Sequence, residues 1–325
     1  MLARLGHRVL AGLAVVLGVV ILTFLLLHAA PGDPVTLLLG PNATPEQVAT
    51  QREALGLDRP LAAQFAAWLN RFARGEWGSS IAQGRPVRQV LGAAWPATVR
   101  LVGLSLLLSY LIGVAVGALQ AARSGSRTDT SLSVASVTLF AMPGYWLGLM
   151  LVLVFTYWAR WLPAFGAAGF DADYLSGGAW LMDRARHLAL PLATLTLVGI
   201  GGAARFVRGA MLDTLSQPFM VTARAKGLTP RQVIVRHALR NALTPVVTLL
   251  GMSLPALFSG AVFVEAVFAW PGVGRVLVEA VQARDYPVVM AATAISAVLV
   301  VLGHLLADAL ATWLDPPVRS ASRSS

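Results

Sequence analysis

The sequence predicts an all-α membrane protein with six transmembrane helices, and composition is the first reason. Of its 325 residues, 57% are hydrophobic and only 12% are charged, whereas soluble proteins carry about 25% charged residues. The mean hydropathy of the chain is +0.70. The second reason is that apolar runs recur at the length of about 20 residues that a helix needs to cross a bilayer. The chain has no cysteine, which excludes disulfides, thiolate metal sites and thiol chemistry.

Six apolar segments have the required length. They are residues 9–29, 98–119, 132–155, 188–206, 243–264 and 288–310. The apolar run from Val9 to Leu27 exceeds the 7–15-residue core of a signal peptide, so we expect an uncleaved first helix. The fourth segment is the weakest because glycines dilute it, although glycine lets membrane helices approach closely. We therefore expect a first helix (1–29), an extracytoplasmic region (30–97), a five-helix core (98–317) and a tail (318–325).

The distribution of basic residues predicts the orientation. With the N-terminus inside, 13 of the 25 basic residues fall in inner segments and 11 in outer ones, with Arg100 at the edge of the second span. The inner segments are shorter, about 70 positions against about 120, so the density of positive charge is higher inside. Both termini are predicted to be cytoplasmic. The net charge of +10 is explained by basic loops, and nucleic-acid binding is a poor interpretation of it.

The extracytoplasmic region is predicted to contain two short helices. Thr44–Gln47 (TPEQ) has the form of a capping box, and the helix that it starts should end at Gly56. A second helix is expected after Pro60. Its large apolar residues fall on one stripe at helical spacing: Leu61, Phe65, Trp68, Leu69 and Phe72. The stripe packs either on the outer ends of the spans and the lipid headgroups or against an external partner.

The sequence offers no candidate catalytic, cofactor-binding or metal-ligating residues. The five histidines form no metal-binding spacing with acidic neighbours, and His304 with Asp308 is better explained by an interhelical hydrogen bond or a wet lining. No Gly-x-Ser-x-Gly nucleophile motif is present. No paired carboxylates lie within a predicted span. The chain is therefore not expected to be an enzyme.

The polar residues of the predicted spans favour a neutral pathway. Ionisable residues lie toward span ends, which disfavours an ion-coupled secondary carrier, since such carriers place charges near mid-membrane. The neutral polar residues predicted to line a pathway are Ser105, Ser109, Thr138, Thr194, Thr196 and Ser253. Lys226 is the only lysine and is followed by Gly-Leu, so the chain lacks the Gly-Lys-Ser/Thr of a phosphate-binding loop. If ATP drives the protein, another subunit hydrolyses it.

A basic segment between the fourth and fifth spans is predicted to fold as two short helices broken at Gly227. Gly227 suits a helix end because glycine adopts the left-handed conformation. Thr229–Gln232 (TPRQ) repeats the capping-box form with Pro230 in the first turn. The second helix should run to about Asn241, and Pro245 should let the fifth span begin at a new angle. A basic amphipathic helix serves either as a headgroup anchor or as an insert in a partner's groove.

Several motifs resemble one family across the chain. Thr222–Leu228 reads TARAKGL and Arg236–Leu243 reads RHALRNAL. The other matching motifs are PGDP (31–34), GLDRP (56–60), GSS (78–80), RPV (85–87), RHLALP (186–191), VEAVFAWPGVG (264–274), RDYPV (284–288) and LDP (314–316). Together they resemble the permease subunits of binding-protein-dependent ABC importers, in particular the first (B-type) permease of the dipeptide/oligopeptide/nickel group. Val221 departs from the family, where arginine is usual.

The resemblance implies a type I ABC importer permease fold with a cytoplasmic coupling helix in the loop 216–242. It implies a second homologous permease, two ATPase subunits that bind ATP and Mg, an extracytoplasmic solute-binding protein and a location in the bacterial inner membrane. The residues implied to contact the ATPase are Thr222, Ala223, Arg224, Ala225, Lys226 and Gly227. Di- and oligopeptides are the expected substrates, with nickel chelates, glutathione and sugars as alternatives within the family. An ion-coupled carrier and a non-transporting scaffold are the alternatives from other classes.

Overall fold

The computed structural model describes residues 2–29, 35, 39–40, 42–54, 56–253 and 261–314, and helices dominate this part of the chain. The bounds of the outer and first core helices are α1 (Leu2–Ala29), α3 (Pro45–Ala54), α4 (Leu61–Ala73), α5 (Val87–Ala122), α6 (Arg127–Ala141) and α7 (Gly144–Val152). The later helices are α8 (Gly177–Leu215), α9 (Pro218–Ala225), α10 (Pro230–Gln232), α11 (Arg240–Ser253), α13 (Val262–Val267), α14 (Val273–Gln282) and α15 (Tyr286–Leu314). Two π-helical turns follow α7 and α10, at Leu153–Trp158 and Val233–Leu239, and a short 3₁₀ turn covers Ala172–Tyr174.

The two long helices α5 and α8 form the centre of the fold, and small residues set their distance. A Cβ on Gly113 would lie 2.5 Å from the Ala203 Cβ, and one on Gly117 would lie 2.5 Å from the Ala204 carbonyl oxygen. Gly199 meets the Ser109 hydroxyl in the same close way. The prediction that glycines bring membrane helices together is therefore confirmed for the fourth span.

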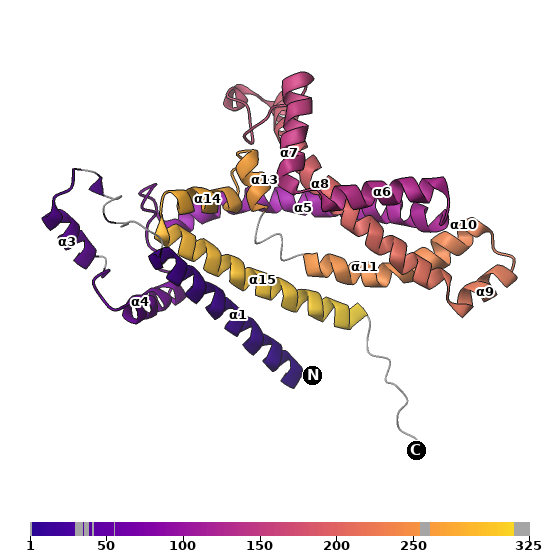
Figure 1. The fold of residues 1–325 in the computed structure, drawn as a ribbon, viewed down its shortest axis with the longest axis horizontal. Helices are drawn as coiled ribbons and strands as arrows, with labels where there is room; N and C mark the ends of the chain where they lie inside the picture. Colours follow the sequence, from indigo (N-terminus) through magenta and orange to yellow (C-terminus); the bar gives the residue numbers. More distant parts are fainter. Residues whose placement is uncertain are drawn as a thin grey trace, which may run out of the picture.

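Other helices pack around this pair. Helix α6 lies along α8, and α1 lies beside α15 (Figure 1). The α1–α15 contact again uses glycine, because a Cβ on Gly12 would lie 2.4 Å from the Val301 side chain. Helices α3 and α4 lie at one end of the molecule and α9 and α10 at the other (Figure 1). The extracytoplasmic region and the basic segment are thus at opposite ends of the long helices.

Up to five spans are present among the described residues. Four helical stretches are long and apolar enough to cross a membrane, in α1, α5, α8 and α15, and the pair 127–141 and 144–158 counts as one bent span. The predicted third span, 132–155, is not one continuous helix, because its two halves meet at 101°. Met142 is extended there (φ −72°, ψ 131°), as expected for a residue before a proline, and Pro143 cannot donate to the helix.

The fifth predicted span, 243–264, falls partly outside the described residues. Helix α11 ends at Ser253 and α13 begins at Val262, so the count of six spans stays a prediction. The motif at 31–34 and the tail at 318–325 also lie outside the described residues.

The extracytoplasmic helices are as predicted. The Thr44–Gln47 capping box is present, with the Thr44 N–H donating to Gln47 Oε1 at 2.9 Å and the Gln47 N–H donating to Thr44 Oγ1 at 3.3 Å. Gly56 has φ +68°. The apolar stripe of α4 packs on α1 and α15, and the Phe24 and Phe65 ring centroids lie 5.3 Å apart. Packing on the outer ends of the spans is the interpretation that the structure supports.

Two buried carboxylates hold the connections at this outer end. Glu265 is fully buried and accepts from the Thr98 hydroxyl at 2.8 Å and from the Gly274 N–H at 2.7 Å. The Asp285 carboxylate accepts from the Ser80 hydroxyl and from the Ala82 N–H. These bonds explain three of the sequence motifs, since they tie 78–80 to 284–288 and fold 264–274 around one carboxylate.

We predict that Gly117→Leu destabilises the protein by about 3 kcal/mol or more, the upper end of the cost of overpacking, because its Cβ meets the backbone of α8. Gly92→Leu on the same helix is the matched control, since its Cβ would meet nothing within 4 Å. Thermal unfolding in detergent, followed by circular dichroism, measures both. An equal midpoint for the two variants would contradict the close α5–α8 contact.

Candidate coupling site

The basic segment folds into a compact element at one end of the long helices (Figure 1). Helix α9 is followed by Gly227 at φ +76°, the left-handed conformation that glycine adopts easily. The Thr229 capping box is present, with the Thr229 N–H donating to Gln232 Oε1 at 2.9 Å. Two helices broken at Gly227 were predicted, and this prediction is confirmed.

The second helix is longer than predicted. Helix α10 continues through the π-helical turn Val233–Leu239 into α11, and Pro245 lies inside α11. Pro245 thus does not interrupt the helix, and the predicted change of angle at Pro245 stays a prediction. A proline removes only one donor from a helix, and membrane helices tolerate it where neighbouring groups satisfy the freed backbone.

Helix α9 has a buried face and an exposed face. Met220 is fully buried and Ala223 is 6% exposed. Met220 belongs to an apolar cluster with residues of α5, α8, the π-helical turn and α11: Ala121, Val207, Met211, Val233, Ala238, Ala242 and Val246. On the opposite face, Phe219 and Val221 are 44% and 64% exposed. The element is therefore anchored on the chain's own helices and presents one side outward.

The structure separates the six residues that were predicted to contact a partner. Thr222, Ala225, Lys226 and Gly227 are exposed. Ala223 is buried against its own chain, so its small side chain serves packing within the chain. The side chain of Arg224 lies outside the described part of the structure. The exposed set is the Thr222, Ala225, Lys226 and Gly227 face, which we call the α9 face.

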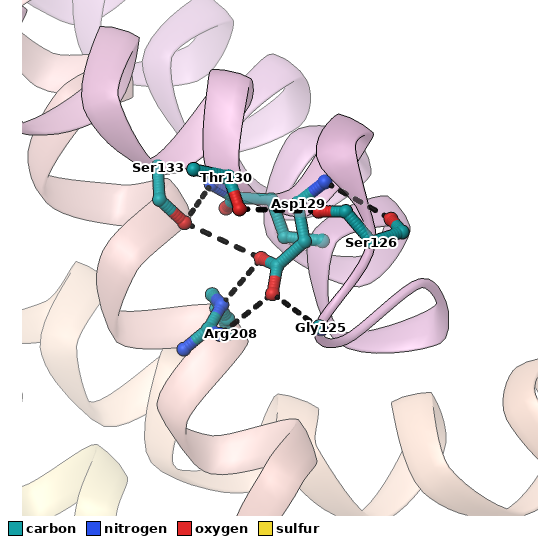
Figure 2. A network of polar contacts seen from close by, with 7 residues as sticks. Gly125, Ser126, Asp129, Thr130, Ser133 and Arg208 are labelled. Carbon is teal, nitrogen blue, oxygen red and sulfur yellow. Dashed lines mark hydrogen bonds and ion pairs between the residues drawn. The ribbon is translucent and has the colours of Figure 1, made fainter.

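An ion pair that sequence reasoning missed lies close to this element (Figure 2). Arg208 of α8 donates from Nε to Asp129 Oδ1 and from Nη2 to Asp129 Oδ2, both at 2.8 Å. The Gly125 N–H donates to Asp129 Oδ2 at 3.0 Å, and Ser133 Oγ donates to Oδ1 at 3.3 Å. Charge-assisted bidentate pairs of this kind fix geometry as well as adding energy. The pair joins the start of α6 to the inner half of α8.

The α6 side of this network, at Ser126 and Asp129, could have been recognised from the sequence. Ser126 is the N-cap of α6 and accepts from the Asp129 N–H at 3.2 Å, and Ser-x-x-Asp at 126–129 has the form of a helix start. Nothing local marks Arg208 as the partner, because it lies 79 positions away in the sequence.

Four of the predicted pathway residues are corrected to packing positions. Ser105, Ser109, Thr194 and Thr196 are at most 6% exposed. The Ser109 hydroxyl donates across to the Thr196 carbonyl at 3.2 Å, which places these two residues at the α5–α8 contact, whereas the hydroxyls of Ser105 and Thr194 donate to carbonyls of their own helices. Hydroxyl side chains are common there because they form hydrogen bonds between membrane helices.

The other two predicted pathway residues lie elsewhere. Thr138 is exposed on α6, and Ser253 is half-buried at the end of α11, 2.8 Å from the Tyr110 hydroxyl. Among the described residues, no group of three or more histidine, aspartate or glutamate side chains could hold a metal ion. His304 is exposed, and the Asp308 side chain lies outside the described part.

A groove of about 590 Å³ opens beside α9. It is lined by Arg205, Phe206, Gly209, Ala210, Asp213, Thr214, Gln217, Phe219, Asn241 and Pro245. Sequence reasoning missed the groove, because three separate segments form it.

We predict that Arg208→Met lowers stability more than Asp129→Asn does. The Asp129 side chain is 5% exposed and the Arg208 side chain 31%, so removing the arginine leaves a buried carboxylate without its counter-ion, whereas the freed arginine reaches water. The double variant should recover part of the loss. Thermal unfolding of the three variants in detergent measures the order, and the reverse order would contradict the buried position of Asp129.

Comparisons with known proteins agree with this architecture. Residues 113–320 match the binding-protein-dependent transport system inner membrane component family, and residues 1–102 match the N-terminal domain of such membrane components.

The chain is 38% identical to the oligopeptide transport system permease protein AppB of Bacillus subtilis, over 98% of this chain and 99% of AppB. It is also 38% identical to the probable D,D-dipeptide transport system permease protein DdpB of Escherichia coli, over 94% of each chain. Identity to the glutathione transport system permease protein GsiC of Salmonella typhi is 35%, over 98% of this chain and 99% of GsiC. The chain belongs to the binding-protein-dependent transport system inner membrane component family, the permease subunits of ABC importers.

Proposed function

We propose that this chain is the first permease of an ATP-driven peptide importer and that the α9 face is its contact with an ATPase subunit. The observation that carries the proposal is the two-sided character of α9. Its inner side is fixed by Met220 and Ala223, and its outer side exposes a row of small or basic residues, Thr222, Ala225 and Lys226, at a glycine bend. Such a surface suits a groove in a partner.

The anchoring of α9 gives the proposed coupling a mechanical route. Met220 packs in one cluster with Met211 of α8 and Val233 after α10. Asp129 ties α8 to α6 in turn. A displacement of α9 by a partner is therefore passed to α8, and through Asp129 to α6. ATP binding then biases the equilibrium between two arrangements of the pathway by the difference in contact energy at α9.

The remaining functions of the proposed transporter belong to other subunits. ATP and Mg are bound by two partner ATPases, in keeping with the absence of a phosphate-binding loop from this sequence. A second homologous permease completes the pathway, and an extracytoplasmic binding protein delivers the solute. Both termini lie in the cytoplasm, and the chain resides in the bacterial inner membrane.

Peptides are the proposed substrates because AppB and DdpB are named as oligopeptide and D,D-dipeptide permeases. Glutathione is the second candidate, since GsiC is named as a glutathione permease. The test of the whole proposal is reconstitution of the chain with its partner permease, ATPases and binding protein. ATP-dependent peptide uptake supports it, and uptake driven by an ion gradient without the ATPases would refute it.

We predict that Ala225→Glu uncouples ATP hydrolysis from uptake and reduces uptake at least tenfold while the protein stays folded, because the Ala225 side chain is exposed on the proposed contact with the ATPase. The tenfold figure corresponds to the loss of roughly 1.4 kcal/mol of contact energy. Ala49→Glu, on the exposed surface of α3, is the control and should leave uptake unchanged. Uptake and ATPase rates are measured together in proteoliposomes. Normal uptake by the Ala225→Glu variant would reject the α9 face as the contact.

A further inference from the structure

The groove beside α9 is built mainly from one face of α8. Its α8 residues recur at helical spacing: Arg205, Phe206, Gly209, Ala210, Asp213 and Thr214, and Gln217 lies just beyond the end of α8. Phe219 of α9 closes one end, and Asn241 and Pro245 of α11 form the opposite wall. The volume of about 590 Å³ lies within the roughly 300–1,000 Å³ of small-molecule sites.

The groove carries one positive and one negative charge that no described residue neutralises. Arg205 and Asp213 are exposed, and neither forms an ion pair with a described residue. The Arg205 guanidinium instead lies over the Phe140 ring at 5.2 Å. Both charged groups are therefore available to a ligand.

The floor between the two charges is open. Gly209 and Ala210 occupy the middle of the stripe, and a Cβ on Gly209 would meet nothing within 4 Å. Space is therefore left above the helix at this point. Small residues in the centre with charged residues at both ends are what an elongated ligand with two charged termini requires.

The spacing of the charges defines the length of that ligand. Eight residues of α-helix rise about 12 Å, which matches three to four residues of an extended peptide at about 3.3–3.6 Å each. We propose that the groove is an inner transit site for short peptides, in which Arg205 binds the C-terminal carboxylate and Asp213 binds the N-terminal ammonium. This inference rests on the proposed function and names a peptide site within it.

The groove lining favours a peptide over other occupants. The side chains of Gln217 and Asn241 offer amide donors and acceptors suited to peptide groups, and Phe206 and Phe219 offer apolar surface at 39% and 44% exposure. A purely anionic ligand leaves Asp213 unmatched, and an apolar partner helix leaves both charges desolvated at a cost. A zwitterion satisfies all of these groups.

The test measures binding of radiolabelled tri-alanine by equilibrium dialysis. The assembled permease–ATPase complex is used without the external binding protein, so that selection by that protein does not contribute. Wild-type complex should bind tri-alanine more tightly than tri-alanine amide or N-acetyl tri-alanine. Arg205→Gln should weaken tri-alanine binding roughly tenfold, the effect of losing one charge-assisted bond, and should abolish the preference for the free carboxylate. Asp213→Asn should abolish the preference for the free ammonium.

A second pair of variants tests the space itself. Gly209→Leu fills the groove without a clash and should abolish binding, whereas Gly18→Leu, also in open space on α1, should leave binding unchanged. Unaltered binding in Arg205→Gln and Gly209→Leu overturns the inference, as does loss of the partner permease from the Gly209→Leu complex, which makes the groove a subunit interface. Absence of ATP-driven uptake by the wild type refutes the proposed function separately.

Discussion

The close contact of α5 with α8 is the constraint on which the rest of this structure depends. Lipid tails are as apolar as leucine, so membrane helices gain little from hydrophobicity alone and must gain from close packing. Gly113 and Gly117 allow that packing because Ala203 and Ala204 of α8 occupy the space where a Cβ atom on each glycine would lie. The Ser109–Thr196 hydrogen bond spans the same contact. The central pair is therefore the scaffold on which other elements pack.

The attachments at its two ends differ in character. At the end that carries α3 and α4, buried carboxylates organise backbone donors, as Glu265 does for Gly274. At the α9 end, an ion pair between side chains joins α6 to α8, and an apolar cluster around Met220 holds α9. Backbone hydrogen bonds to one carboxylate fix the conformation of a single loop. Side-chain contacts between helices instead link α6, α8 and α9 to one another, so a displacement of α9 would be passed to the other two helices.

The sequence predicted the features that depend on local chemistry. Capping boxes at Thr44 and Thr229 and the break at Gly227 follow from short-range hydrogen bonds and backbone angles, so they were predicted correctly. The bend at Pro143 also has a local cause, but the apolar run continues across it, so the hydropathy pattern predicted one span without a break. The composition of a segment shows how apolar it is, but it does not show where the helix changes direction.

The candidate site was predictable only in part, because its geometry comes from distant segments. Periodicity alone gave no means of telling that Ala223 faces inward while Ala225 faces outward, since that depends on where α8 and the turn after α10 lie. The buried hydroxyls of Ser105 and Thr194 were taken for a pathway because polarity in a span has two uses, lining and helix contact. Only the packing of α5 on α8 distinguishes them.

The groove and the α9 face share α8, and this has a mechanical consequence for the proposed transport cycle. Phe219 belongs both to α9 and to the groove wall, while Arg205 and Asp213 lie on α8. Any shift of α9 relative to α8 therefore changes the width of the groove at the Phe219 end. An ATPase that displaces α9 then alters the affinity for a peptide in the groove, and by thermodynamic reciprocity a bound peptide alters the affinity of α9 for the ATPase. Contact at one helix is in this way sufficient to connect nucleotide state with peptide release.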